Sequence, residues 1–170
     1  MTGRQTALWI INAALAVGIA ALTVLGGLQL AAKTRPAPIA LADQADLRQA
    51  VTDAAATSTV KILTYSSDTI ERDIAAGLAV TTGDFADYYK DFTQQTVLPA
   101  ARQKNVKTAT TVVQSGVISI DNPDTAAALV FINQVTTSTD NPEPSNSQSA
   151  VRVGMKKVDG QWLIDSFDPQ

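Results

Sequence analysis

Residues 151–167, VRVGMKKVDGQWLIDSF, carry the signal of a β-hairpin. Asp159 and Gly160 suit a two-residue primed turn, because both central positions of that turn need a positive φ. The segments on either side, 151–158 and 161–167, are rich in residues that favour strands. The sequence therefore predicts that the chain ends in two antiparallel strands joined by a tight turn.

Two more strands are predicted upstream of the hairpin. Residues 108–120 are rich in Thr, Val and Ile, with Gly116 as a candidate bulge. Residues 126–137, AAALVFINQVTT, have apolar side chains at both parities, with Leu129, Phe131 and Val135 on one face and Val130 and Ile132 on the other. This pattern indicates a middle strand that is covered on both sides. A polar loop with prolines, residues 139–147, is expected to be mobile.

Three helices are predicted before the strands. Asp43 can cap a helix to about residue 65, in which apolar residues recur every three or four positions. A shorter helix is expected from Ser67 or Asp68 to about residue 79, and a third from Asp84 to about 103, kinked or interrupted by Pro99. Three helices followed by four antiparallel strands indicate an α+β fold with the helices on one face of the sheet.

Residues 8–32, LWIINAALAVGIAALTVLGGLQLAA, have no charged side chain. About 20 apolar residues suffice to cross a bilayer as a helix, so we expect a retained transmembrane anchor. Residues 1–7 are then a short cytoplasmic tail, 33–42 a tether with prolines, and 43–170 one extracytoplasmic domain. A cleaved signal peptide is the alternative, because residues 40–42, Ala-Leu-Ala, have the small-x-small form of a cleavage site.

Composition excludes several classes of function. Residues 43–170 contain all 16 acidic residues and ten of the 13 basic ones, so this part has a formal charge near −6. An acidic surface repels phosphate backbones, which argues against a nucleic-acid partner. The chain has no Cys and no His. It therefore lacks thiolate chemistry, the usual general base and the commonest metal ligand. We expect no enzyme, no cofactor and no metal site.

Few residues remain as candidates for a site. An aromatic row at helical spacing could line a pocket for an apolar ligand, although a packed core needs the same residues and is the favoured interpretation. The candidate lining residues are Tyr65, Phe85, Tyr88, Tyr89, Phe92, Phe131 and Trp162. An acidic row, Asp84, Asp87 and Asp91, is interpreted as the solvated face of a helix. Asp165 and Asp168 are the remaining carboxylates considered as a base.

Four short segments resemble the Mce-associated membrane proteins of actinobacteria. They are LTY at 63–65, TGDF at 82–85, LPAA at 98–101 and DGQWLIDSF at 159–167. The resemblance implies an anchor followed by a cone-shaped domain like nuclear transport factor 2 and SnoaL, with a curved sheet. It also implies a non-catalytic accessory subunit of an Mce system that imports sterols or fatty acids, with Mce transporter subunits as partners.

Two alternatives stay open at this point. The VirB8-like proteins of type IV secretion and conjugation also carry such a domain on one amino-terminal span, where the domain serves as an assembly scaffold. A membrane-anchored module that binds a lipid in the cone is the other alternative. All three hypotheses place the domain outside the cytoplasm, on a single-pass anchor in the cell membrane.

Overall fold

A computed structural model describes residues 40–170. The predicted tail, the anchor and most of the tether lie outside these residues. Most of the alternative signal peptide lies outside them too. Among the described residues, no helix has both the length and the apolar character that crossing a membrane requires. Ile39–Gln170 is one compact unit of the chain.

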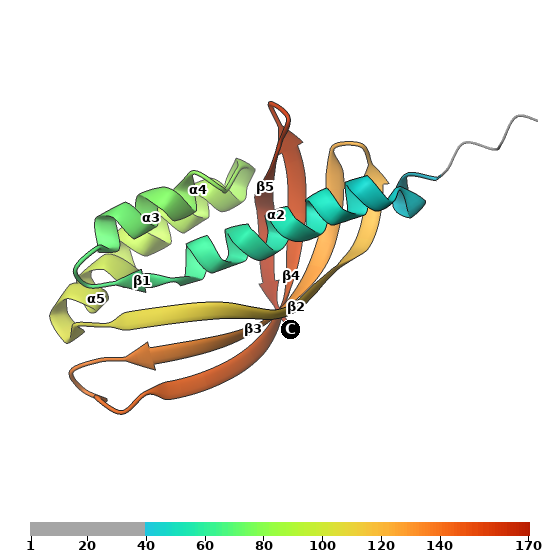
Figure 1. Cartoon of the computed structure of the whole chain (residues 1–170). Helices are drawn as coiled ribbons and strands as arrows, with labels where there is room; N and C mark the ends of the chain where they lie inside the picture. The colour runs from blue at the N-terminus through green and yellow to red at the C-terminus, as the bar shows by residue number, and fades with distance from the viewer. Residues whose placement is uncertain (1–39) are drawn as a thin grey trace, which may run out of the picture. The chain divides into compact units, whose positions relative to one another are not determined.

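The helices precede the main strands, as predicted (Figure 1). A 3₁₀ turn, η1 (Leu41–Asp43), leads into α2 (Ala45–Leu63), and α3 (Ile70–Leu78) follows. The third helical segment is α4 (Gly83–Phe92), a π-helical turn η2 (Thr93–Val97) and α5 (Leu98–Lys104). The predicted caps are wrong, because Gln44 precedes α2 and Thr69 precedes α3.

The third helical segment is interrupted and then resumes, as predicted. The interruption is the π turn Thr93–Val97, and Pro99 lies directly after it, in the first turn of α5. The segment ends at Asn105, whose φ of 49° gives the left-handed conformation that often closes a helix.

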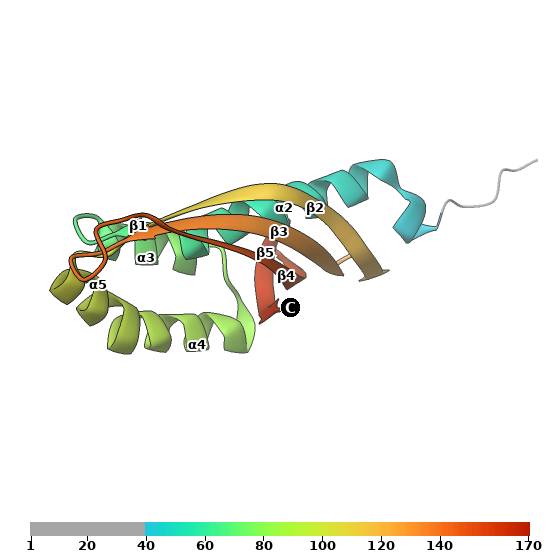
Figure 2. The same cartoon turned by 90° about the horizontal axis from the view of Figure 1, so that it is seen from below.

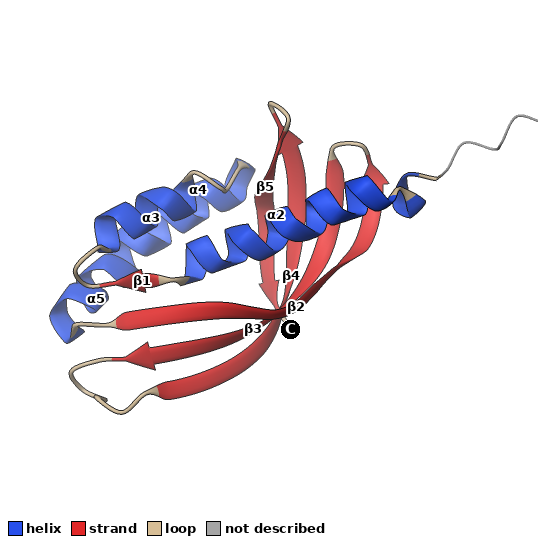
Figure 3. Ribbon diagram, in the orientation of Figure 1, coloured by secondary structure: helices blue, strands red, loops and turns tan. Residues whose placement is uncertain are grey.

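The sheet has five antiparallel strands in the order β1-β2-β3-β4-β5 (Figure 3). They are β1 (Tyr65–Ser66), β2 (Lys107–Asn122), β3 (Thr125–Thr137), β4 (Ser145–Val158) and β5 (Gln161–Pro169). The prediction of four strands is wrong by one. Tyr65, expected at the end of a helix, instead pairs with Thr108 as the first residue of the edge strand β1.

The sheet curves over α4, which lies on its concave side (Figure 2). The register between β2 and β3 shifts between Val112 and Gln114 and between Val117 and Ser119, so Val113 and Ile118 are extra residues. Gly116, predicted as the bulge, pairs in register with Leu129. Bulges increase the local twist and bend of a strand, which suits the curvature of the sheet.

One face of the sheet carries the core, because α2 packs across β2, β3, β4 and β5. The buried cluster joins Val51 and Ala55 of α2 to Val130, Ile132 and other residues of the sheet. The opposite face of β3 is open, since the side chains of Phe131 and Val135 are 42% and 39% exposed. The prediction that β3 is covered on both sides is therefore wrong among the residues described.

The predicted hairpin is confirmed. Asp159 and Gly160 have φ values of 50° and 82° and join β4 to β5. The polar loop is shorter than predicted, because β4 begins at Ser145 and pairs there with Thr136.

Candidate functional site

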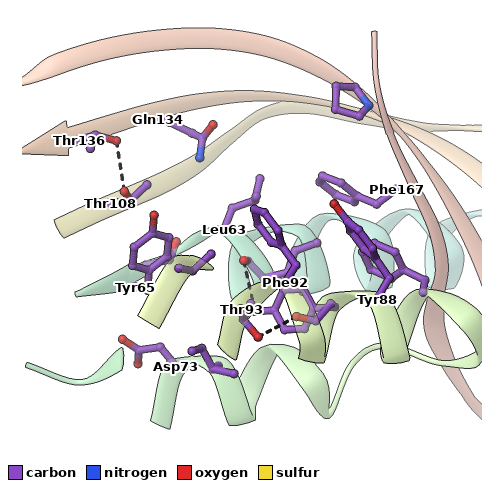
Figure 4. Close-up of a pocket in the computed structure, with 17 residues that line it drawn as sticks. Leu63, Tyr65, Asp73, Tyr88, Phe92, Thr93, Thr108, Gln134, Thr136 and Phe167 are labelled. Carbon is purple, nitrogen blue, oxygen red and sulfur yellow. Dashed lines mark hydrogen bonds between the residues drawn. The ribbon is translucent and has the colours of Figure 1, made fainter. Parts of the chain in front are cut away.

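A cavity of about 460 Å³ lies among β1, β2, β3, β5 and the helices (Figure 4). It is lined by apolar, aromatic and uncharged polar side chains together with one carboxylate. The lining residues are Ile62, Leu63, Thr64, Tyr65, Asp73, Ile74, Phe85, Tyr88, Tyr89, Phe92, Thr93, Val97, Thr108, Gln134, Thr136, Phe167 and Pro169. The cavity is the candidate site of the domain.

The segment before α4 fixes that helix to the sheet. The backbone N–H of Thr82 donates to the carbonyl of Ile164 at 2.8 Å, and the N–H of Ile164 donates to the carbonyl of Val80 at 2.9 Å. Gly83 follows with a φ of 60°, and a Cβ there would lie 2.9 Å from Oδ1 of Asp165. This close approach sets where α4 starts, and hence where its aromatic row lies.

Phe85 is the centre of the aromatic cluster. Its ring centroid lies 6.2 Å from Tyr89, 6.3 Å from Tyr88 and 6.1 Å from Phe167 of β5. Tyr88 also stacks on Phe92 at 5.8 Å. Tyr88 and Phe92 are 62% and 44% exposed, so this part of the cavity lining meets solvent. The favoured prediction that the row is simply core is wrong for these two residues.

Tyr89 is the buried member of the row, at 8% exposure. Its hydroxyl donates to the carbonyl of Ile62 at 3.4 Å. Burial, with smaller contributions from the nearby Asp73 and Tyr65, raises the pKa of Tyr89 to about 12. A tyrosine with so high a pKa keeps its proton at neutral pH, so it serves here as a neutral packing and donor group.

The part of the lining that comes from β2 and β3 is polar but uncharged. The hydroxyls of Thr108 and Thr136 are 3.2 Å apart, and the side-chain amide of Gln134 donates to Oγ1 of Thr110 at 3.4 Å. Figure 4 shows Thr108, Thr136 and Gln134 together at one end, away from Tyr88 and Phe167. The lining is thus sorted into a polar end and an aromatic end.

Asp73 is the one carboxylate of the described lining. It accepts a hydrogen bond from the backbone N–H of Ser66 at 3.2 Å and another from the hydroxyl of Thr69. Nε of Arg72 lies 3.8 Å away, on a side chain that is 79% exposed. The carboxylate is thereby tied to the start of α3, and it remains a negative group beside the cavity.

The structure brings together five of the seven predicted lining residues: Tyr65, Phe85, Tyr88, Tyr89 and Phe92. Phe131 lies on the opposite face of the sheet, so its placement in the site is wrong. Trp162 packs at the margin of the core, with the Lys157 ammonium 5.8 Å from its ring centroid. Phe167, which was not among the predicted lining residues, also lines the cavity.

The predicted acidic groups lie outside the cavity. Asp84, Asp87 and Asp91 are exposed on α4, and Asp165 and Asp168 are exposed on β5. Within residues 40–170, no three acidic residues lie close enough together to hold a metal ion. The described cavity lining offers aromatic surface, hydroxyl groups, one side-chain amide and one carboxylate to a bound molecule.

No model of a known protein family matches the chain. Solved structures identify the fold. The periplasmic domain of DotI matches with a TM-score of 0.60 over 72% of this chain and 94% of that domain, at 15% identity. An IcmL-like type IV secretion system protein of Legionella pneumophila matches equally well, at 0.60 over 75% and 92%, with 14% identity. VirB8 of Agrobacterium tumefaciens matches at 0.54 over 69% and 88%, with 15% identity. The domain thus has the fold of VirB8-like periplasmic domains.

Two relatives from Mycobacterium tuberculosis are similar to the chain, and one of them shows the family. Uncharacterized protein Rv1362c is 47% identical over 121 residues, which cover 71% of this chain but only 54% of the relative. The chain thus spans about half the length of that relative. Outer membrane protein Rv1973 is 34% identical over 130 residues, 76% of this chain and 80% of the relative. The chain belongs to the same protein family as Rv1973.

Proposed function

We propose that the protein is a non-catalytic assembly subunit of a multi-protein complex in the cell envelope. The observation that carries this proposal is the VirB8-like fold, which recurs in proteins of type IV secretion systems. The name of the relative Rv1973 supports an envelope location. For the specific function of this subunit, we therefore favour a scaffold of the VirB8 type over a component of a lipid importer.

The Mce interpretation has weaker support. It depends on four short segments, and two of them, TGDF and DGQWLIDSF, have structural roles in this domain. Gly83 permits the close approach to Asp165, and Asp159 with Gly160 forms a hairpin turn. Such segments are expected in any chain with this arrangement of α4 and β5, whatever its partners. Mce subunits remain an alternative outcome of the partner experiment.

The outer face of the sheet is the surface that we assign to contact with another subunit of the complex. Phe131 and Val113 are 42% and 64% exposed there, and they border one shallow hollow with Gln114, Asn133 and Gln148. Exposed apolar groups within an uncharged polar rim are typical of protein contact surfaces. The cavity lies on the other side of the sheet, so the two surfaces can be tested separately.

The test is affinity purification of the full-length protein from its own host in a mild detergent, with mass spectrometry of the proteins that come with it. Components of a secretion channel would support the proposal, and Mce subunits would replace it with the importer interpretation. A protein recovered without partners would contradict both. Phe131→Ser should weaken capture. Tyr88→Ser should not, although Tyr88 at the cavity is the more exposed of the two aromatic residues.

The envelope location has an independent test, because the chain contains no cysteine. Ser147 is exposed at the start of β4, so Ser147→Cys introduces a single reactive thiol. A membrane-impermeant maleimide should label this variant in intact cells as strongly as in lysed cells. Labelling that requires lysis would contradict an extracytoplasmic domain.

A further inference from the structure

The cavity has the size of a small-molecule site. Its volume of about 460 Å³ falls within the ~300–1,000 Å³ typical of ligand pockets. Tyr88 and Phe92 belong to its lining and are also largely exposed to solvent. A packed core would have buried these rings, because exposing them forgoes the hydrophobic gain of burial. The exposed rings instead form an apolar approach to the cavity.

The polarity of the lining limits the ligand to an amphiphile. At one end, Phe85, Tyr88 and Phe167 present aromatic surface that suits a flat or ring-containing apolar body. At the other end, Thr108, Thr136 and Gln134 offer hydroxyl and amide groups. Hydroxyls can both donate and accept, so this end matches an alcohol or a carbonyl oxygen on the ligand.

The charges limit the ligand further. None of the described lining residues is Lys or Arg, and Asp73 adds a negative charge. A carboxylate in this cavity would lose its hydration without gaining a cation, and it would lie near a like charge. A fatty-acid carboxylate therefore fits poorly.

We propose that the cavity binds an uncharged amphiphile, with the ring-bearing body against Phe85, Tyr88 and Phe167 and a hydroxyl or carbonyl oxygen at Thr108, Thr136 and Gln134. This binding site is separate from the outer face that we assign to assembly. It discriminates by charge, so the neutral form of a molecule binds more tightly than its anionic counterpart.

A matched pair of photoreactive probes tests the proposal on the full-length protein. 4-(Hydroxymethyl)benzophenone carries an uncharged alcohol, and 4-benzoylbenzoate carries a carboxylate on the same ring framework. After irradiation, peptide mass spectrometry locates the label. The alcohol should label peptides from α4 and β5 about tenfold more than the carboxylate does, which corresponds to ~1.4 kcal/mol. Equal labelling by the two probes, or labelling of other peptides only, would overturn the proposal.

Two variants sharpen the test. Thr136→Val keeps the shape but removes one hydroxyl, so labelling by the alcohol should fall roughly two- to tenfold, the range for one hydrogen bond. Thr111→Val is the control, because Thr111 is exposed on the same sheet and is not among the lining residues. Asp73→Asn should raise labelling by the carboxylate, since it removes the like charge. If neither variant changes labelling, the polar end does not contact the ligand.

The outcome is separable from that of the assembly proposal. Thr136→Val should leave the captured partners unchanged, while Phe131→Ser should leave labelling of the cavity unchanged. Loss of both activities in either variant, with circular dichroism unchanged, would show that the two surfaces are one site and would overturn their assignment to separate roles.

Discussion

Gly77 of α3 lies directly against the hydroxyl of Tyr89 of α4, so that a Cβ at position 77 would be 2.2 Å from Oη. This contact joins the two helices beside the cavity. Gly77→Ala should destabilise the domain by about 1–2 kcal/mol, because the clash costs more than the ~1 kcal/mol that alanine gains in a helix. Urea unfolding followed by circular dichroism measures the change.

The double variant identifies the clash as the cause. Tyr89→Phe removes the atom at 2.2 Å but leaves Cζ at 2.8 Å from the added methyl group. The loss caused by Gly77→Ala should therefore be smaller in the Tyr89→Phe background, though not zero. Strictly additive effects of the two substitutions would contradict direct contact between these positions.

Tyr89 should make the domain less stable at high pH. Its pKa is raised from 10.0 to about 12, so the folded state retains a proton that the unfolded state loses in this interval. The associated stability is fully present below pH 10 and is lost as pH rises to about 12, by roughly 2–3 kcal/mol in total. Between pH 10 and pH 12 the free energy of unfolding of the wild type should fall by this amount more than that of Tyr89→Phe. Urea unfolding of both proteins at the two pH values measures the difference. Parallel pH profiles would contradict the shift.

Phe131 and Ile132 are neighbours on β3 with opposite surroundings, at 42% and 2% exposure. Ile132→Ala should cost about 2–5 kcal/mol, because it leaves a hole in the core. Phe131→Ala should cost no more than ~1 kcal/mol, since the side chain keeps much of its contact with water. Similar losses of unfolding free energy for the two variants would show that the outer face is covered in the folded protein.

Gly160 should be far less replaceable than Gly116. Gly160 has a φ of 82°, and alanine there adopts a left-handed conformation at a cost of about 1–2 kcal/mol. Gly116 has no atom within 4 Å of an added Cβ and no positive φ, so Gly116→Ala should change stability by less than ~0.5 kcal/mol. The difference between the two urea midpoints is the measurement.

The sequence predicts what depends on local chemistry. The Asp159-Gly160 turn follows from the φ values that its two residues tolerate, and the α+β order follows from the change of period along the chain. Tyr65 could not be assigned this way, because its strand exists only through pairing with Thr108. The helical spacing of apolar residues extends through Tyr65, so the sequence alone predicts a helix there.

The site was only partly predictable for a similar reason. Helical spacing brings Phe85, Tyr88, Tyr89 and Phe92 to one region, but it does not tell which rings are buried. On β3, Phe131 and Ile132 are equally apolar, so the pattern could not identify the face that α2 covers. The cavity also depends on Phe167 and on the threonines of β2 and β3, which no local motif connects to α4.

The π turn Thr93–Val97 is the place where this helical segment can change its length by one residue. Its hydrogen bonds span five residues instead of four, so it absorbs one residue more than a regular α-helical turn. Deleting one residue here should therefore give a continuous α-helix in which α4 keeps its aromatic row on the cavity and α5 keeps the buried Ala101 and the ion pair of Arg102 with Glu71 at 2.7 Å. A deletion within α4 would instead rotate part of the aromatic row by about 100°. Members of the family should therefore differ by one residue at the π turn more readily than within α4.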